Sequence, residues 1–368
     1  MTKEIRTILP PEERVGYAVI GLGELTTEEL LPAFRLSGRS RLAAIVSGDR
    51  DEALQKARQH GLSDADVYSY EQFEELRGRE DVQAVFIVLP NSLHREYAER
   101  AARIGKHVLC EKPLSDTPEN AEAMVRACRE AGVRLMTAYR IQYTPHHQLA
   151  RELIERGELG RVKLINSVNT QVEANDGQWR LKRELAGGGS LPDVGLYCLN
   201  TARFLTGEEP YEVFAYTHST PGDPRFKEVE ESVSFILRFP SGIIANCLTS
   251  YGAAQHRALT VYGEDANLSL DPAFTYTNLR VVQASPEAAT EHLVREVDQF
   301  ALELDHFSMC VQEDLTPYTP GEEGLQDQRI LAALYQSAEQ GRPVQLERLE
   351  GRDLFRGTPP VQPDRQRS

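Results

Sequence analysis

The sequence predicts an α/β protein whose N-terminal part is a doubly wound parallel sheet, followed by an α+β domain on a mostly antiparallel sheet. Two observations carry this prediction. Between residues 16 and 138, short apolar strands alternate strictly with helical patterns, as in βαβ units whose strands are buried on both faces. After about residue 150, strand patterns follow one another directly, with a tight turn at Pro240-Ser241-Gly242, which is typical of antiparallel hairpins.

The first strand, residues 17–20, ends in the turn Gly21-Leu22-Gly23, and a helical pattern follows with Thr26 or Thr27 as its expected N-cap. Strand, glycine turn and helix form the context in which a G-x-G sequence cradles a pyrophosphate. Thr26 stands where the third small residue of the dinucleotide fingerprint is expected, so a plain turn is the alternative. We predict that Gly21, Leu22 and Gly23 bind a dinucleotide.

The end of the second strand, residues 41–47, bears on the choice between NADP and NAD. An acidic residue there binds the ribose 2′-hydroxyl, whereas its absence near an arginine suits a 2′-phosphate. Ser47 occupies the strand end and Arg50 follows closely, which favours NADP over NAD. Asp49 and Glu52 argue the other way, because their charges would repel a phosphate.

Further candidate cofactor residues follow the next strands. Tyr70 is expected to stack near the adenine or the 2′-phosphate, with a core tyrosine as the alternative. The strand of residues 84–89 ends in Leu89-Pro90-Asn91, and His94 follows one turn later. We expect Asn91 and His94 to contact the ribose or the nicotinamide, and a solvated helix N-terminus is the alternative for both.

The strand of residues 107–111 ends in Glu111-Lys112-Pro113, where proline stops the strand and leaves Lys112 at its carboxyl end. Ligands bind at the carboxyl ends of strands in open parallel sheets, so Glu111 and Lys112 are candidate cofactor residues. Arg140 and Tyr143 follow the last strand of this half, residues 134–138, and are expected to line the same cleft.

Asp193 and Tyr197 lie four residues apart, directly after the glycine-rich run 187–190. If a helix begins near Asp193, both side chains project from one face of its first turn. The alternative is that Asp193 caps the helix and Tyr197 packs in the core. The neighbouring strand candidates and the later helical patterns are residues 163–172, 212–218, 231–239, 242–251 and 258–262, and residues 297–311 and 326–340.

Composition limits the remaining classes of function. The net charge of −15 argues against a nucleic-acid partner. The five cysteines form no C-x-x-C pair and are predicted to be reduced core thiols rather than zinc ligands. No apolar run approaches the length of a membrane span, and residues 1–14 lack the apolar core of a signal peptide, so a cytoplasmic location is expected.

These segments together resemble the Gfo/Idh/MocA oxidoreductase family, and within it the glucose–fructose oxidoreductase branch. The resemblance covers about residues 16–344. The motifs that carry it are Gly21-Leu22-Gly23, Val46-Ser47-Gly48, residues 89–94, Glu111-Lys112-Pro113, residues 178–181, residues 183–191, residues 193–197, residues 207–210 and residues 320–324.

The resemblance implies an N-terminal Rossmann domain and an α+β domain with a large open, mostly antiparallel sheet, whose exposed face pairs subunits as a homodimer or homotetramer. The expected ranges are 1–14 for an N-terminal extension, 15–140 for the Rossmann domain, 141–346 for the substrate and oligomerisation domain, and 347–368 for a C-terminal tail. Glu52 stands where that branch carries a lysine toward the 2′-phosphate, and this departure argues against tight NADP binding.

The resemblance also implies catalytic roles. Lys112 lies beside the nicotinamide and the reacting oxygen, Tyr197 is the proton donor or acceptor, and Asp193 orients Lys112 or a sugar hydroxyl. The chemistry fits, because oxidising a carbinol needs a proton removed as hydride leaves for the cofactor. A tyrosine hydroxyl, with its reference pKa of ~10, is a poor base at neutral pH, and a nearby ammonium group favours the phenolate.

The expected substrate is a small sugar, contacted by Lys112, Asp193 and Tyr197. Trp179 and Arg180 are expected to cover the nicotinamide or to grip the sugar, since an indole stacks on a sugar face and arginine binds hydroxyls. A packed surface tryptophan is the alternative. Tyr143 and Arg180 complete the predicted substrate residues.

Three hypotheses remain open at this point. The first is an NADP-dependent sugar oxidoreductase that takes hydride from C1 of an aldose, with C2 of a ketose as a further acceptor. The second is a simple NAD(P)-dependent dehydrogenase or reductase with an exchangeable cofactor, acting on an aldose or an anhydro-sugar. The third is a non-catalytic sugar or nucleotide sensor, against which the presence of both Lys112 and Tyr197 argues.

Overall fold

The computed structural model describes residues 8–361, and these divide into two compact units. The first unit contains residues 8–143, 297–325 and 355–361. The second contains Thr144–Glu296 and Gln326–Leu354. The units are therefore not contiguous ranges: the first boundary lies close to the expected residue 140, but two later segments pack with the first unit.

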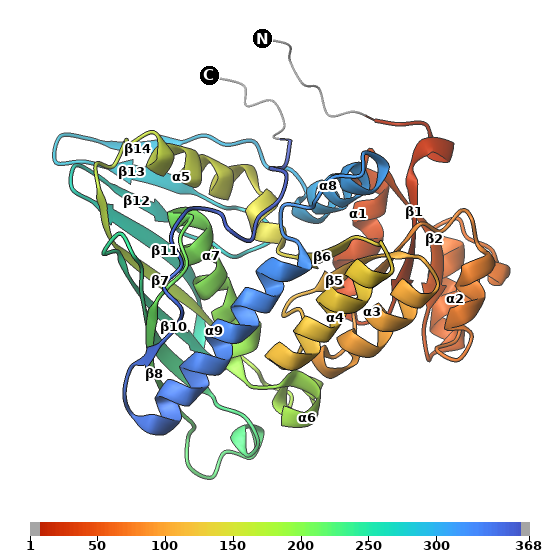
Figure 1. Ribbon diagram of the computed structural model, residues 1–368, viewed down its shortest axis with the longest axis horizontal. Coiled ribbons are helices and arrows are strands. Elements are labelled where there is room, and N and C mark those ends of the chain that lie inside the picture. The colour runs from red at the N-terminus through yellow and green to blue at the C-terminus, as the bar shows by residue number, and fades with distance from the viewer. Residues whose placement is uncertain (1–7, 362–368) are drawn as a thin grey trace. The chain divides into compact units, whose positions relative to one another are not determined.

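The first unit is built on a six-stranded sheet in the order β3-β2-β1-β4-β5-β6, and every neighbouring pair is parallel (Figure 1). All six residues of β1 are buried, as expected for a strand covered on both faces. The strands are β1 (Val15–Ile20), β2 (Ser40–Val46), β3 (Val67–Tyr68), β4 (Ala84–Ile87), β5 (His107–Glu111) and β6 (Leu135–Ala138). The predicted doubly wound parallel sheet is confirmed.

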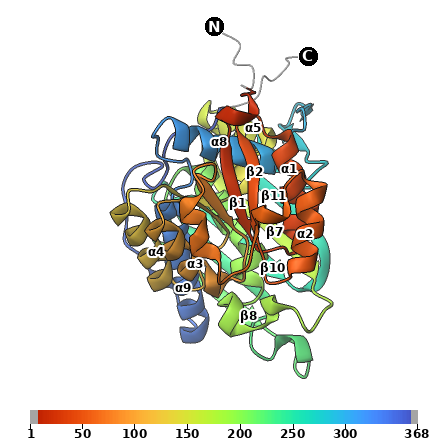
Figure 2. The ribbon, with the colours of Figure 1, turned by 90° about the vertical axis from the view of Figure 1, so that its right-hand side faces the viewer.

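Helices cover both faces of this sheet. Figure 2 shows α1 (Leu31–Leu36) and α2 (Arg50–Gln59) on one side of β1 and β2, and α3 (His94–Arg103) and α4 (Pro118–Glu130) on the other. Helix α8 (Gln299–Gln312) also belongs to this unit, although it follows the whole second sheet in the sequence. It contacts α1, β1 and β2, so the late helix completes the core of the early domain.

The second unit is built on a nine-stranded sheet in the order β14-β13-β12-β11-β7-β10-β9-β8-β15. Only the pair β7 and β10 is parallel among the described strands, and all the other neighbours are antiparallel. The strands are β7 (Val162–Val172), β8 (Glu212–His218), β9 (Ser232–Arg238), β10 (Ile244–Ser250), β11 (Gly252–Gly263), β12 (Asn267–Leu270), β13 (Val281–Ala284), β14 (Ala289–His292) and β15 (Val344–Gln345). The predicted mostly antiparallel sheet is confirmed.

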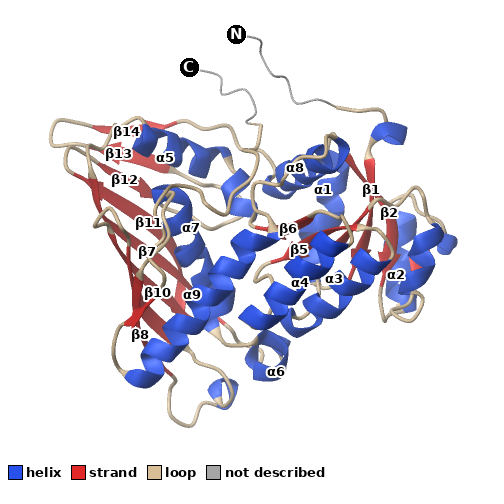
Figure 3. Cartoon of the chain, viewed as in Figure 1, coloured by secondary structure: helices blue, strands red, loops and turns tan. Residues whose placement is uncertain are grey.

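The two faces of this sheet differ. Figure 3 shows α5 (Pro145–Glu155) and α7 (Leu196–Thr206) over one face, and no described helix of this unit over the other. Along β9, Val233, Phe235 and Leu237 are buried while the residues between them face outward. The open face carries apolar side chains that are exposed, namely Leu164, Tyr216, Ile236 and Leu248.

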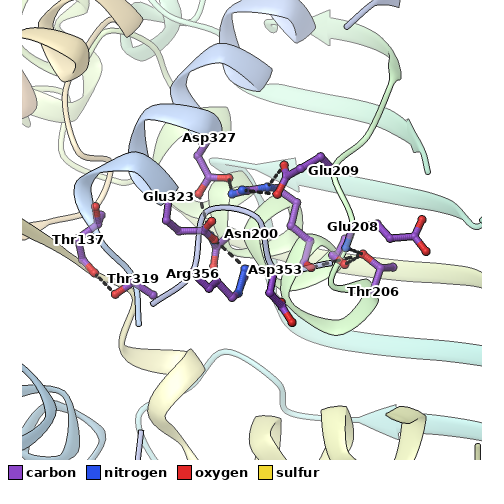
Figure 4. A network of polar contacts seen from close by, with 12 residues as sticks. Thr137, Asn200, Thr206, Glu208, Glu209, Thr319, Glu323, Asp327, Asp353 and Arg356 are labelled. Carbon is purple, nitrogen blue, oxygen red and sulfur yellow. Dashed lines mark hydrogen bonds and ion pairs between the residues drawn. The ribbon is translucent and has the colours of Figure 1, made fainter. Parts of the chain in front are cut away.

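A buried ion-pair network holds the second unit together beneath α7 (Figure 4). The Arg203 side chain is fully buried and donates to both carboxylate oxygens of Glu209 at 2.8 Å. It also donates to Asp327 of α9 (Gly321–Gln340) at 2.5 Å, and Asn200 donates to the other oxygen of Asp327 at 2.8 Å. A buried arginine is tolerated here because its guanidinium charge is paired with the carboxylates of Glu209 and Asp327.

The C-terminal segment is predicted as a tail, but its described residues belong to the compact units: residues 347–354 to the second and residues 355–361 to the first. Arg356 and Glu323, both almost fully buried, form an ion pair at 2.8 Å (Figure 4). The backbone N–H of Thr358 donates to Thr316 at 2.9 Å. The N-terminal extension is described from residue 8, and Arg14 donates to the Leu9 carbonyl at 2.8 Å.

Among residues 8–361, no helix combines the length and the apolar character that a bilayer crossing requires. All five cysteines are buried and unbridged, as predicted for core thiols.

Candidate active site

The turn after β1 is the predicted dinucleotide site, and its conformation depends on glycine. Gly21 has φ +98°, and a Cβ at this position would lie 2.3 Å from the Val88 carbonyl oxygen, so only glycine lets β1 end this close to β4. A Cβ on Gly23 would meet no other described residue within 4 Å. Gly21 therefore fixes the turn, and the space beside Gly23 is open at the start of a helix.

The helix that follows begins earlier than expected. It is helical from Glu24, contains a π-helical turn over Thr26–Leu30 and continues as α1. Thr26 is fully buried inside this turn, and neither Thr26 nor Thr27 is its N-cap, so that expectation is wrong. The first helical residues nevertheless follow Gly23 directly, which keeps the helix N-terminus beside the glycine turn.

The end of β2 gathers the residues predicted for the adenosine. Ser47 is almost fully buried, and its hydroxyl accepts from the Asp49 N–H at 3.1 Å. Asp49 caps α2 by accepting from the Glu52 N–H at 3.0 Å. Arg50 is exposed in the first turn of that helix, and a Cβ on Gly48 would lie 3.1 Å from the Tyr70 ring. Burial raises the pKa of Tyr70, whose ring lies edge-on to Tyr97.

Asn91 and His94, which follow β4, have different surroundings in the structure. Leu89 and Asn91 are buried at the strand end, beside Pro90. His94 is fully buried, with Nε2 2.8 Å from the Leu89 carbonyl and Nδ1 3.1 Å from the Pro113 carbonyl. Burial lowers the pKa of His94. Both ring nitrogens are occupied by the backbone, so the predicted contact of His94 with the cofactor is not supported; the ring ties the β4 and β5 ends together.

Strand β5 ends at Glu111, and Lys112 is the next residue. The peptide bond between Lys112 and Pro113 is cis. The Lys112 N–H donates to the Glu111 carboxylate at 3.2 Å, and Lys112 is half-buried. Glu303 of α8 is fully buried, and its carboxyl oxygens have no hydrogen-bond partner among the described residues. Burial, followed by the charge of Glu111, raises the pKa of Glu303 well above its usual value, which favours its neutral form.

Arg140 and Tyr143 behave differently from each other. Arg140 is buried, donates to the Gln299 side chain and lies with its guanidinium carbon 6.0 Å from the Phe300 ring centre. Tyr143 is 1% exposed, and its hydroxyl lies 2.8 Å from that of Thr319. The ring packs in the core of the first unit, so the structure gives no support to the predicted contact of Tyr143 with substrate, which stays a prediction.

The second unit brings Asp193 and Arg180 together, as predicted for a substrate site. A π-helical turn over Leu191–Gly195 runs directly into α7, so Asp193 and Tyr197 lie on one continuous helix. The Asp193 carboxylate accepts from the Tyr251 hydroxyl at 2.6 Å and lies 3.4 Å from Arg180 Nε. The alternative in which Asp193 caps the helix is wrong, because the helix begins before it.

The neighbouring aromatic residues complete this group. Arg180 lies over the Trp179 ring, with the guanidinium carbon 4.6 Å from the ring centre. Tyr197 is half-buried, and its ring centre lies 5.8 Å from that of Phe274. We refer to Trp179, Arg180, Asp193 and Tyr251 as the Asp193 cluster.

Tyr251 is the residue that the sequence did not single out. It is fully buried, and burial followed by the charge of Asp193 raises its pKa well above the usual value, so its hydroxyl keeps the proton that it donates. It lies 58 residues beyond Asp193 in the sequence, and no spacing rule connects them.

Among residues 8–361, no group of three or more histidine, cysteine, aspartate or glutamate side chains is arranged to hold a metal ion. The predicted cofactor residues belong to the first unit, except Trp179 and Arg180, and the predicted catalytic residues Asp193 and Tyr197 belong to the second. The joint action of Lys112 and Tyr197 therefore stays a prediction.

Two family models match the chain. Residues 15–139 match the oxidoreductase family with an NAD-binding Rossmann fold, and residues 147–269 match the GFO/IDH/MocA C-terminal domain. The two matches meet close to the boundary between the first and the second unit.

Named relatives match nearly the whole chain. The D-xylose 1-dehydrogenase [NADP(+)] of Haloarcula marismortui is 34% identical over 90% of this chain and 93% of its own. The 1,5-anhydro-D-fructose reductase of Ensifer adhaerens is 29% identical over 90% of this chain and 98% of its own. The crystal structure of the aldose-aldose oxidoreductase from Caulobacter crescentus, complexed with glycerol, is 40% identical, with a TM-score of 0.88 over 90% of this chain and 100% of that one.

These matches confirm the predicted family and the predicted Rossmann domain followed by an α+β domain. The chain therefore belongs to the GFO/IDH/MocA family of oxidoreductases.

Proposed function

We propose that this enzyme is an NADP-dependent sugar oxidoreductase that oxidises an aldose at C1 and returns the reducing equivalent to a second sugar. The observation that carries the proposal is the Asp193 cluster on the helix that also bears Tyr197, in a chain whose β5 ends in Glu111-Lys112. The xylose dehydrogenase, the anhydrofructose reductase and the aldose-aldose oxidoreductase all carry sugars in their names, which supports a sugar substrate here.

NADP is the proposed cofactor, and the first unit has features that suit it. The backbone of Leu22 and Gly23, with open space beside Gly23, would hold the pyrophosphate, and Ser47, Arg50 and Tyr70 would hold the adenosine and its 2′-phosphate. Asp49, which argued against a phosphate, is engaged as the cap of α2. The name of the Haloarcula relative supports NADP over NAD. When bound, NADP supplies the nicotinamide that exchanges hydride with the sugar carbon.

The residues of this chain would then handle the proton. Oxidation of the C1 hydroxyl releases one proton, which Tyr197 accepts as the C–H bond breaks, and the reverse reduction returns it. Lys112 assists by favouring the negative charge on the oxygen atoms at this step. Asp193, fixed by Tyr251 and Arg180, orients a sugar hydroxyl, and Arg180 with Trp179 lines the sugar.

Two measurements test this function. The protein as purified is denatured, and the released nucleotide is identified by mass and absorbance; NADP or NADPH at close to one per chain is expected. The untreated protein is then mixed with glucose and fructose, or with two aldoses, without added cofactor. Turnover supports a retained cofactor, and a requirement for added NADP eliminates it.

A second candidate is a simple dehydrogenase that releases its cofactor in each turnover. The name of the Haloarcula relative, which pairs one sugar with NADP(+), favours it. Turnover of one sugar that requires added NADP establishes this candidate. Absence of any sugar-dependent change in cofactor absorbance would instead support a non-catalytic sensor, despite the presence of Lys112 and Tyr197.

We also propose that the open face of the second sheet pairs subunits as a homodimer or homotetramer. Leu164, Tyr216, Ile236 and Leu248 are exposed on that face, and apolar sheet surface of this kind marks an interface. Light scattering is expected to give two or four chains, and the combined change Ile236→Lys and Leu248→Lys is expected to give monomers.

We further propose a cytoplasmic location, which the buried, unbridged cysteines support.

A further inference from the structure

The connection between β8 and β9, residues 219–231, contacts every part of the second unit that forms the Asp193 cluster. Its Phe226 and Val229 form one apolar cluster with Leu181, Val194 and Tyr251, each of which is a member of the Asp193 cluster or adjacent to one. The Glu228 carboxylate accepts from the Arg183 N–H at 3.2 Å and from the Lys182 ammonium at 3.1 Å, two to three residues after Arg180. We refer to residues 219–231 as the bracing loop.

Glu230, near the end of the bracing loop, binds the start of the helix that carries Asp193 and Tyr197. Its buried carboxylate accepts from the Gly189 N–H at 2.9 and 3.0 Å and from the Leu191 N–H at 3.0 Å. The Tyr335 hydroxyl donates to the same carboxylate at 3.0 Å. A buried carboxylate with these donors is satisfied, and it in turn fixes two backbone amides at the beginning of the helix.

This contact explains why the chain needs glycines before the helix. A Cβ on Gly188 would lie 1.9 Å from the Tyr335 hydroxyl, and a Cβ on Gly189 would lie 2.1 Å from the Glu230 carbonyl oxygen. Because Gly188 and Gly189 carry no side chain, the backbone here can approach Tyr335 and Glu230 closely.

The next residue of the bracing loop holds the other donor to Asp193. The Tyr251 N–H donates to the Glu231 carbonyl at 2.8 Å, and the Tyr251 hydroxyl donates to Asp193. Glu230 and Glu231 thus fix both the helix that carries Asp193 and the tyrosine that orients it. Glu230 and Glu231 are adjacent along the backbone. A shift at Glu230 is therefore transmitted both to the helix that carries Asp193 and to Tyr251.

We propose that Glu230 is a positioning residue for the reaction: by holding the amides of Gly189 and Leu191, it sets the orientation of Asp193 and Tyr197. This inference rests on the proposed function for its catalytic consequence, but its geometric part does not. Glu230→Ala removes the acceptor from two buried N–H groups, and the start of the helix must then shift to satisfy them. Glu230→Gln keeps one acceptor oxygen, so it is expected to restore part of the arrangement.

The single tryptophan of the chain makes the geometry measurable without turnover. Trp179 stacks against Arg180, which pairs with Asp193, so its emission and its quenching by acrylamide report on the Asp193 cluster. The variants are E230A, E230Q and the control E264Q, which neutralises an exposed carboxylate paired with Arg161 and Lys163 in the same unit. Circular dichroism verifies folding, and NADP affinity is measured by titration.

We expect E230A to change the Trp179 quenching constant at least about twofold and to lower kcat at least about tenfold. NADP affinity should change less than kcat, because the predicted cofactor residues other than Trp179 and Arg180 lie in the unit that does not contain Glu230. For E230Q, the quenching constant and kcat should lie between those of E230A and the unchanged protein. For E264Q, both should match the unchanged protein.

Unchanged quenching in both folded Glu230 variants would overturn the proposal, and so would changed quenching with kcat within twofold. If E230A does not fold, E230Q decides in the same way. An unchanged protein without sugar turnover would overturn the proposed function, while the quenching data would still decide whether Glu230 positions the cluster.

Discussion

Asp193 connects three stretches of the second unit through one carboxylate. Arg180 comes from the segment before the glycine run, Asp193 from the start of the helix, and Tyr251 from the position between β10 and β11. A charged acceptor with two fixed donors keeps one orientation, which is what a group that aligns a sugar hydroxyl must do.

At this scale we predict that Tyr251→Phe lowers kcat/KM at least about tenfold, since a hydrogen bond to a charged group is worth roughly 1.5–3 kcal/mol. The ring stays buried, so folding should be retained. Steady-state kinetics of the variant checks this, with Tyr216→Phe on the open face as the matched control. A kcat/KM for Tyr251→Phe within twofold of the unchanged protein would contradict the assigned role.

The sequence predicted some single residues and missed others for physical reasons. Asp193 and Tyr197 share a helix, so their four-residue spacing was readable. Tyr251 and Glu230 reach the same place only through sheet pairing and a loop, which leave no local pattern. Tyr143 and His94 follow strand ends as expected, but their rings turn into the core, and side-chain direction after a strand is not encoded in spacing.

At the scale of elements, α7 and α9 are joined by the buried pair of Arg203 with Glu209 and Asp327. We predict that Arg203→Met lowers the free energy of unfolding by about 3–5 kcal/mol, because two carboxylates then stay buried without their partner. Urea denaturation measures this.

The matched control is Arg161→Met, which breaks the exposed pair with Glu264 and should cost less than about 1 kcal/mol. Equal losses for both variants would show that the buried network contributes no more than a surface pair.

His306 of helix α8 is expected to make the stability of the folded protein depend on pH. Burial lowers the pKa of His306 from 6.5 to about 3, and its Nε2 accepts from the Tyr318 N–H at 2.9 Å. Between these two values the unfolded chain binds a proton that the folded chain does not, so stability falls as pH falls through this window. One such group removes about 1.4 kcal/mol per pH unit inside the window.

We expect His306→Gln, whose side-chain oxygen still accepts a hydrogen bond, to flatten the fall in unfolding free energy between pH 6.5 and 4 by about one proton. Denaturant titrations at several pH values measure the slope. The exposed His218→Gln is the control and should keep the original slope. An unchanged slope for His306→Gln would show that this group does not titrate on unfolding.

Elements with strong periodicity were predicted within a few residues of their bounds. Strand β8 covers the predicted 212–218, and β7 begins one residue before the predicted 163. The missed strands are short: β3 and β15 have two residues each, and β12, β13 and β14 have four each, too few for an alternating pattern. Two helices contain a π-helical turn, at Thr26 and at Leu191. Both helices begin earlier than the expected capping residues.

At the scale of the whole molecule, chain order and folding unit differ. The sequence change near residue 150 located the first boundary, because the pattern switches there from alternating strands and helices to successive strands. The return of residues 297–325 and 355–361 to the first unit had no such sign, since α8 has the pattern of an ordinary apolar helix. Tertiary packing, and not the local sequence pattern, decides that α8 belongs to the first unit.

The proposed mechanism requires Lys112 of the first unit and Tyr197 of the second to act on the same carbon–oxygen bond. A double-mutant cycle of Lys112→Met and Tyr197→Phe tests it, with the rate of hydride transfer followed by cofactor absorbance in single turnovers. Each change alone should slow transfer at least about 100-fold. The double variant should be no more than about tenfold slower than the slower single variant, since residues that act as a unit are not additive. A double loss equal to the product of the single losses, or a single variant within twofold of the unchanged protein, would contradict the account.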